Sequence, residues 1–228
     1  MEKLGPLGAM AVAPTLICLV YMYIRDKYER EPWRMLATGI VVGTIITFPI
    51  MQGQGFVARF MPLAIGQFGE AVFTSFAIAG FVEEAFKFIA LYLLVWRSRE
   101  LNEPVDGIVY AAFISLGFAG VENVLYVFNP QLGGWSTALM RAVVSVPAHG
   151  LFGIIMGYHF AIARFEPHSK NLRIFMAFFA AWVAHGVYNT ILLSGYSFYL
   201  VVFVPFLLML WHGGLKKIRM HLEASPFK

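Results

Sequence analysis

A set of polar residues lies inside long apolar stretches of this 228-residue chain, and their types can do acid–base or metal chemistry. A carboxylate and an imidazole can hold a water molecule and take its proton. A second histidine and an asparagine can donate hydrogen bonds to the oxyanion that forms when a carbonyl is attacked. The combination indicates hydrolysis of an amide bond without a covalent intermediate. The residues are Glu83, Glu84, Lys87, Glu122, Asn123, His149, His185 and Asn189.

The same residue types leave a metal-dependent mechanism open. One glutamate and two histidines form a known ligand set of catalytic zinc, and here the ligands would be Glu83, His149 and His185. The chain has no H-E-x-x-H sequence, so the metal signal is weak. We therefore expect no cofactor, with zinc as the alternative.

The elements that position these residues are membrane helices. The chain is 59% apolar and 13% charged, with a mean hydropathy of +0.70, whereas soluble domains are about 45–50% apolar and about 25% charged. A helix that spans a bilayer needs about 20 apolar residues, and none of the apolar stretches alternates as a barrel strand would. We predict an all-α, polytopic helical bundle that forms one integral-membrane domain over residues 1–228. Its seven expected spans are Gly5–Ile24, Met35–Met51, Ala71–Trp96, Gly107–Phe128, Ala142–Ala163, Ile174–Leu193 and Tyr196–Leu215.

Basic residues alternate between the connections of these spans. Because lysine and arginine mark the cytoplasmic side, the pattern predicts an outer N-terminus and an inner C-terminus. It also accounts for the net charge of +4 without a nucleic-acid partner, which we do not expect. The residues assigned to the cytoplasmic side are Arg25, Lys27, Arg30, Arg34, Arg97, Arg99, Arg164, Lys170, Arg173, Lys216, Lys217, Arg219 and Lys228. The longest outer connection, Gln52–Gly69, is expected to be a loop that lies on the membrane surface or covers a site.

The spans place the ionisable groups at matching depths. Glu122, His149, His185 and Glu83 fall roughly 9 to 18 Å from the outer ends of their spans, at about 1.5 Å per residue. Charged groups at such depth are costly and rare unless functional. Lys87 follows the two glutamates at helical spacing and can pair with either. We therefore expect one site in the outer half of the membrane.

An ordered set of short sequences resembles the PrsW family of bacterial intramembrane proteases over nearly the whole chain. The family is similar in turn to the CAAX prenyl endopeptidase and to bacteriocin-processing membrane proteins. This chain departs from that wider pattern in two places: a lysine follows the second glutamate by three residues, and Ser145 precedes His149 by four. The sequences that carry the resemblance are Ala13-Pro14, Asp26-Lys27-Tyr28-Glu29-Arg30-Glu31-Pro32, Glu83-Glu84-Ala85-Phe86-Lys87, Gly120-Val121-Glu122-Asn123, His149-Gly150 and His185-Gly186-Val187-Tyr188-Asn189.

The resemblance implies a role for most of these residues. Glu83 looks like the carboxylate that activates water, helped by His149. Glu84 looks like the partner of a cation, and His185 and Asn189 look like the oxyanion pair. Glu122 has no counterpart in the wider pattern, so it remains a site residue with an open role.

The resemblance also implies a substrate. PrsW proteins make the first cut in a single-span, membrane-embedded anti-sigma factor on its extracytoplasmic side, which places the chain in a bacterial cell membrane with lipid around it. Two other hypotheses remain open from the residues alone. Intramembrane Glu, His and Lys also suit a proton-coupled transporter, and a non-catalytic scaffold or sensor of membrane-active peptides would need no chemistry at all.

Overall fold

A computed structural model describes residues 4–61 and 66–228, and the regular structure of these residues is entirely helical. The prediction of an all-helical membrane protein is confirmed. The α-helices are α1 (Leu4–Arg25), α2 (Trp33–Ala58), α3 (Gly66–Phe73), α4 (Val82–Val95), α5 (Pro104–Val127), α6 (Trp135–Met140), α7 (Val146–Phe165), α8 (Lys170–Leu193) and α9 (Ser197–Glu223). Two π-helical segments, η1 (Thr74–Phe81) and η2 (Arg141–Ser145), join α3 to α4 and α6 to α7, and a 3-10 turn, η3 (Pro167–Ser169), precedes α8.

Within the described residues, six helical segments are long and apolar enough to cross a membrane. The expected third span is also helical, through α3, η1 and α4, but its apolar stretch contains Glu83, Glu84 and Lys87. The six segments are Gly5–Arg25, Trp33–Ala58, Pro104–Val127, Trp135–Phe165, Pro167–Leu193 and Val201–Glu223.

The expected outer loop Gln52–Gly69 is mostly helical, so that prediction was wrong for most of its length. Helix α2 continues to Ala58, and α3 begins at Gly66. Residues 62–65 lie outside the described part of the chain. Glutamine is a good helix former, so the Gly- and Gln-rich composition ended the apolar run without ending the helix. As a result Gln54 is a helical residue that faces the bundle.

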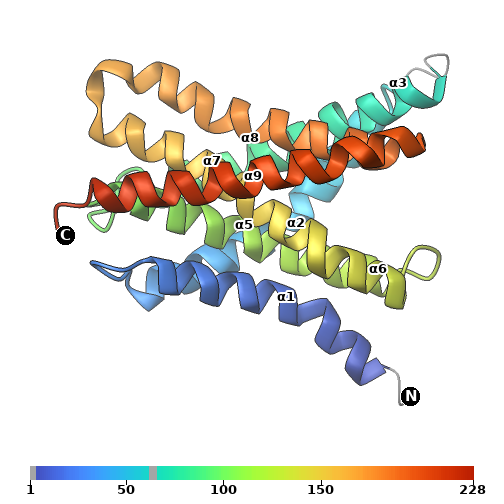
Figure 1. Ribbon diagram of the computed structural model, residues 1–228, viewed down its shortest axis with the longest axis horizontal. Coiled ribbons are helices and arrows are strands. Elements are labelled where there is room, and N and C mark those ends of the chain that lie inside the picture. Colours follow the sequence, from blue (N-terminus) through green and yellow to red (C-terminus); the bar gives the residue numbers. More distant parts are fainter. Residues whose placement is uncertain (1–3, 62–65) are drawn as a thin grey trace.

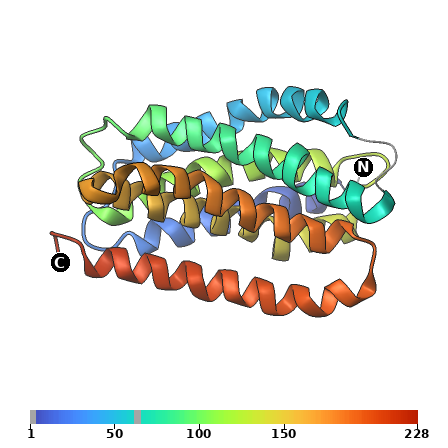
Figure 2. The same ribbon diagram turned by 90° about the horizontal axis from the view of Figure 1, so that it is seen from above.

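The helices run side by side along one axis of the molecule (Figures 1 and 2). The connections before α2, α5 and α8 gather with the end of the chain at one end of the bundle, and α1 begins at the other end. These connections carry the basic residues assigned above to the cytoplasmic side. The arrangement agrees with an odd number of crossings, while the orientation in the membrane stays a prediction.

Helix α5 forms the centre of the bundle, between α2 and α7. A side chain at Gly43 of α2 would collide with the carbonyl of Ile114, and one at Gly157 of α7 would collide with the carbonyl of Gly107. Small residues allow helix backbones to approach this closely in membranes. The glycine-bearing side of α7 is therefore its contact with α5, and this contact directs His149, near the start of α7, toward the interior of the bundle.

A second group of buried carboxyls lies in the connection between α1 and α2, far along the chain from the residues singled out above. The backbone N–H of Glu31 donates to Asp26 Oδ2 at 2.8 Å, and the Tyr110 hydroxyl donates to the Glu31 carboxyl. Burial, together with the neighbouring Asp106 carboxyl, raises the pKa of Glu31 to about 11. Glu31 is thus held in its protonated form at neutral pH.

Replacing Glu31 with glutamine is expected to make the protein more resistant to alkaline pH. An acid whose pKa is raised by folding stabilises the folded state below its unfolded pKa, and this advantage is lost as pH rises toward the folded value. The loss is at most about 1.4 kcal/mol per pH unit for one group. A Glu31→Gln variant keeps an acceptor for Tyr110 but carries no proton to lose. Thermal unfolding in detergent at pH 6 and pH 9 should show a smaller drop in Tm for the variant than for the wild type, and an equal drop would contradict the assignment.

Candidate active site

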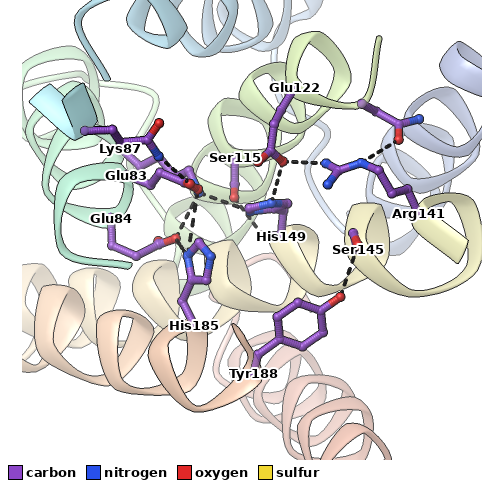
Figure 3. A network of polar contacts seen from close by, with 12 residues as sticks. Glu83, Glu84, Lys87, Ser115, Glu122, Arg141, Ser145, His149, His185 and Tyr188 are labelled. Carbon is purple, nitrogen blue, oxygen red and sulfur yellow. Dashed lines mark hydrogen bonds and ion pairs between the residues drawn. The ribbon is translucent and has the colours of Figure 1, made fainter. Parts of the chain in front are cut away.

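The candidate site is a buried cluster of charged side chains from three helices, drawn in Figure 3. Helix α4 supplies Glu83, Glu84 and Lys87, α7 supplies His149, and α8 supplies His185. Each is at most 5% exposed. The structure therefore brings together four of the residues that the sequence singled out, along with the lysine expected to pair with them.

The ammonium of Lys87 lies in the middle of this cluster. Its Nζ is 2.9 Å from Glu84 Oε1, 3.4 Å from Glu83 Oε2 and 3.2 Å from His149 Nδ1. The ring of Phe118 packs against the same ammonium, with its centroid 4.4 Å away. The spacing predicted that Lys87 could pair with either glutamate, and in the structure it contacts both. The other oxygen of Glu83, Oε1, accepts a 3.0 Å hydrogen bond from the Gln54 amide.

Each histidine is oriented by a carboxylate of its own. The first couple is Glu84 with His185, in which Nδ1 of the ring lies 2.8 Å from Glu84 Oε1. A carboxylate oxygen accepts, so Nδ1 carries the proton and Nε2 keeps its lone pair. The ring of Phe152 stacks on His185 at 4.8 Å and fixes its plane.

The second couple is Glu122 with His149. Nε2 of His149 lies 3.0 Å from Glu122 Oε2, and the same oxygen accepts a 2.6 Å bond from Nη2 of Arg141. Arg141 is itself fixed by its Nε bond to Asn123 at 3.0 Å and by the face of Tyr126. In this couple Nε2 of His149 carries the proton and Nδ1 keeps its lone pair. Glu122, whose role the sequence left open, is therefore the partner of a site histidine.

The two π-helical segments lie directly before the site residues on their helices. η1 ends at Phe81, two residues before Glu83, and η2 ends at Ser145, four residues before His149. π-helical turns are rare and frequent at functional sites. A π-helical turn rotates the residues after it about the helix axis. The segments η1 and η2 therefore determine which face of α4 and of α7 carries the charged groups.

A cavity of about 500 Å³ opens onto the cluster. Its polar wall includes Glu83, Glu122, His149 and His185, and its other walls are largely apolar side chains of α2, η1, α5 and α8. Asn189, the expected partner of His185 in the oxyanion pair, lines the same cavity one helical turn after the histidine.

The donor set fits a divalent metal ion. Glu83, Glu84, His149 and His185 each offer one ligand atom, and these atoms lie within 4.8 Å of one another. Carboxylate oxygen and imidazole nitrogen are ligands of zinc and related ions. Glu122 on Nε2 of His149 matches the outer-shell carboxylate that orients a metal-binding histidine. Glu84 fixes the other ring through Nδ1 of His185, which also lies 3.9 Å from Glu83 Oε2. The residues present can therefore hold a metal.

Comparison with known proteins identifies the family. Residues 31–210 match the model of the family described as PrsW family intramembrane metalloprotease. The chain belongs to the PrsW family. Protease PrsW of Bacillus subtilis is 35% identical over 91% of this chain and 92% of its own length. The protein of the same name from Geobacillus kaustophilus is 35% identical over 91% of this chain and 88% of its own length. The one from Clostridioides difficile is 30% identical over 95% of this chain and 91% of its own length. No solved structure matches the chain.

Membership in the PrsW family makes the protein a membrane peptidase, in place of the transporter and scaffold hypotheses. It also corrects one prediction. We expected no cofactor, and this was wrong, because the family is one of metalloproteases and the buried donors Glu83, Glu84, His149 and His185 could bind a metal. The missing H-E-x-x-H sequence misled because the donors come from three separate helices, so no short motif marks them.

Two residues of the network were missed by sequence reasoning. Gln54 was placed in the outer loop, and Arg141 was not among the expected site residues. The position of Arg141 could have indicated its place near the site, because it precedes His149 by eight residues, which is about two helical turns. Gln54 gave no such signal, because nothing in the sequence tells that α2 passes beside α4.

The Glu122 couple predicts a graded effect on metal affinity. Glu122→Ala removes the acceptor of His149 Nε2, and loss of such an outer-shell partner typically costs about 10–100-fold in metal affinity or activity. Glu122→Gln keeps an acceptor oxygen and should lose less. Zinc affinity of the purified proteins, measured by competition with a chromophoric chelator, checks this order. Equal affinities for wild type and Glu122→Ala would show that the carboxylate does not orient the ring.

Proposed function

We propose that the protein is a metal-dependent intramembrane endopeptidase that makes the first, extracytoplasmic-side cut in a single-span anti-sigma factor. The observation that carries the proposal is the buried donor cluster of Glu83, His149 and His185 on the wall of a cavity, in a chain of the PrsW family. The anti-sigma substrate follows from the family resemblance of the sequence. The membrane is then the bacterial cell membrane.

In this proposal Glu83, His149 and His185 hold the metal. When bound, the ion supplies a Lewis acid for the amide carbonyl and lowers the pKa of a bound water. Glu122 and Glu84 hold the two rings in place through Nε2 of His149 and Nδ1 of His185. Asn189, on the cavity wall, is the candidate donor to the oxyanion.

The walls of the cavity suit a transmembrane substrate. Ile50, Ile78, Leu125 and Leu192 line it and can receive apolar side chains. A substrate helix must unwind locally to expose its amide, and unpaired backbone is tolerated only where it lies against protein or water rather than lipid. The polar side of the cavity provides such a place.

Variants of the cluster are expected to abolish cleavage. Loss of a positioned catalytic group costs about 10²–10⁴-fold, so Glu83→Gln and His149→Ala should each lose at least that much activity on a co-reconstituted single-span substrate. His159→Ala, on the same helix ten residues away and bonded to Arg173, and Glu70→Gln, on the exposed face of α3, are matched controls that should cleave normally. A chelator should stop the wild type, and zinc should restore it. Full cleavage by Glu83→Gln and His149→Ala would refute the proposal.

The side of the cut can be tested together with the orientation of the enzyme. In a Cys18→Ser background, Gln131→Cys in the connection between α5 and α6 should react with a membrane-impermeant thiol reagent in intact cells. His168→Cys lies in the connection between α7 and α8, which is at the opposite end of the bundle, and should react only after lysis. Sequencing the new N-terminus of the cleaved substrate should then place the cut in the outer half of its span. The reverse labelling pattern, or a cut in the inner half, would contradict the proposed side.

A further inference from the structure

The cluster contains a cation of its own. The three acceptors around the Lys87 ammonium are Glu83 Oε2, Glu84 Oε1 and His149 Nδ1. An ammonium has three donors and no acceptor, so these three contacts use all its protons. Three of the four candidate metal donors therefore face a lysine at the point where they converge.

His149 cannot serve both cations at once. Its Nε2 is engaged by Glu122, which leaves Nδ1 as the nitrogen with a free lone pair. That lone pair is directed at Lys87 Nζ, 3.2 Å away. One lone pair binds one cation, so a metal held by His149 requires the ammonium to leave Nδ1.

An acceptor for the displaced ammonium is already present. Glu84 Oε2 is buried and has no hydrogen-bond partner among the residues that the structure describes, while Oε1 of the same carboxylate contacts both Lys87 and His185. A buried carboxylate oxygen without a partner is unfavourable. Glu84 can thus keep Lys87 when the ammonium leaves His149 and Glu83.

We propose that Lys87 is an internal competitor for the metal, which neutralises the donor cluster when no metal is bound and moves onto Glu84 when one binds. The inference rests on the proposed function. It narrows the metal ligands to Glu83, His149 and His185 and makes Glu84 a positioning residue that anchors the lysine and His185. Lys87 then lowers the metal affinity in two ways: its ammonium occupies Nδ1 of His149, and its positive charge remains beside the ion after it has moved.

The test compares metal binding by wild type, Lys87→Met and Lys87→Arg in the purified full-length protein, stripped of metal and then titrated with zinc against a chromophoric chelator. Methionine keeps the length of the side chain without its charge, and arginine keeps the charge. Removing a unit charge next to a divalent ion in a buried site should tighten binding by about tenfold or more. We expect this for Lys87→Met and not for Lys87→Arg.

Thermal unfolding gives a second readout that does not depend on activity. Without metal, Lys87→Met leaves Glu83 and Glu84 unneutralised, so its Tm should fall below that of the wild type. Zinc should raise its Tm by more than it raises that of the wild type, because tighter binding stabilises more at a given concentration. If Lys87→Met does not fold, Lys87→Gln is measured in its place.

The outcomes separate the inference from the proposed function. Cobalt in place of zinc should give the same visible spectrum in wild type and Lys87→Met, which indicates the same ligands, and a Glu84→Gln variant should give it too. Equal or weaker zinc affinity of Lys87→Met with that same spectrum would overturn the role of Lys87 and leave the metalloprotease intact. Absence of metal binding by every variant and by the wild type would overturn the proposed function, and the inference with it.

Discussion

The structure depends on mutual neutralisation of charges in an apolar surrounding. Glu83, Glu84 and Lys87 lie on one helix, almost fully buried, at a position where a single unpaired charge would be costly. Neutralisation within α4 alone is incomplete, because two carboxylates face one ammonium. The neutral rings from α7 and α8 add hydrogen bonds to the same groups, since His149 Nδ1 accepts from Lys87 and His185 Nδ1 donates to Glu84. The cluster thus ties three helices together, and breaking it would leave a buried charge rather than an exposed one.

Close helix packing makes this cluster geometrically specific. The glycines of α2 and α7 bring both helices against the backbone of α5, so neither can rotate without a clash. The π-helical segments before α4 and α7 then set the direction of the site residues within that frame. A second anchor, the bond from Asn123 to the Ala11 carbonyl, fixes α1 to the part of α5 that carries Glu122. The π-helical segments therefore set the direction of the site side chains, and the tight helix packing keeps that direction fixed.

The sequence was sufficient for the helices and for most of the cluster, for a physical reason. Apolar runs of about 20 residues can only be membrane helices, and charged groups within them must meet partners, so Glu83, Glu84, His149 and His185 could be grouped by depth alone. Depth does not tell which helices are neighbours. The bond from Gln54 to Glu83 and the chain from Arg141 through Glu122 to His149 depend on the packing of α2 against α4 and of α5 against α7. Zinc remained only the alternative for the same reason, since its candidate ligands Glu83, His149 and His185 are close only in space.

The two carboxylate–histidine couples give each ring of the cluster a fixed orientation. Glu122 engages one nitrogen of His149 and Glu84 engages one nitrogen of His185, so each ring has a single free lone pair with a fixed direction. Fixed directions restrict the cluster to ions that accept that geometry. The Glu122 couple turns the protonated nitrogen of His149 away from Lys87 and toward α5. The protonated Nδ1 of His185, by contrast, lies 2.8 Å from Glu84 Oε1 and 3.9 Å from Glu83 Oε2. Because Arg141 of η2 lines the cavity and fixes Glu122, the orientation of His149 is coupled to the wall of the cavity. In the proposed function, rings held in this way leave the departure of Lys87 from Nδ1 of His149 as the main rearrangement before the donors can act, so little binding energy is needed to orient the rings themselves.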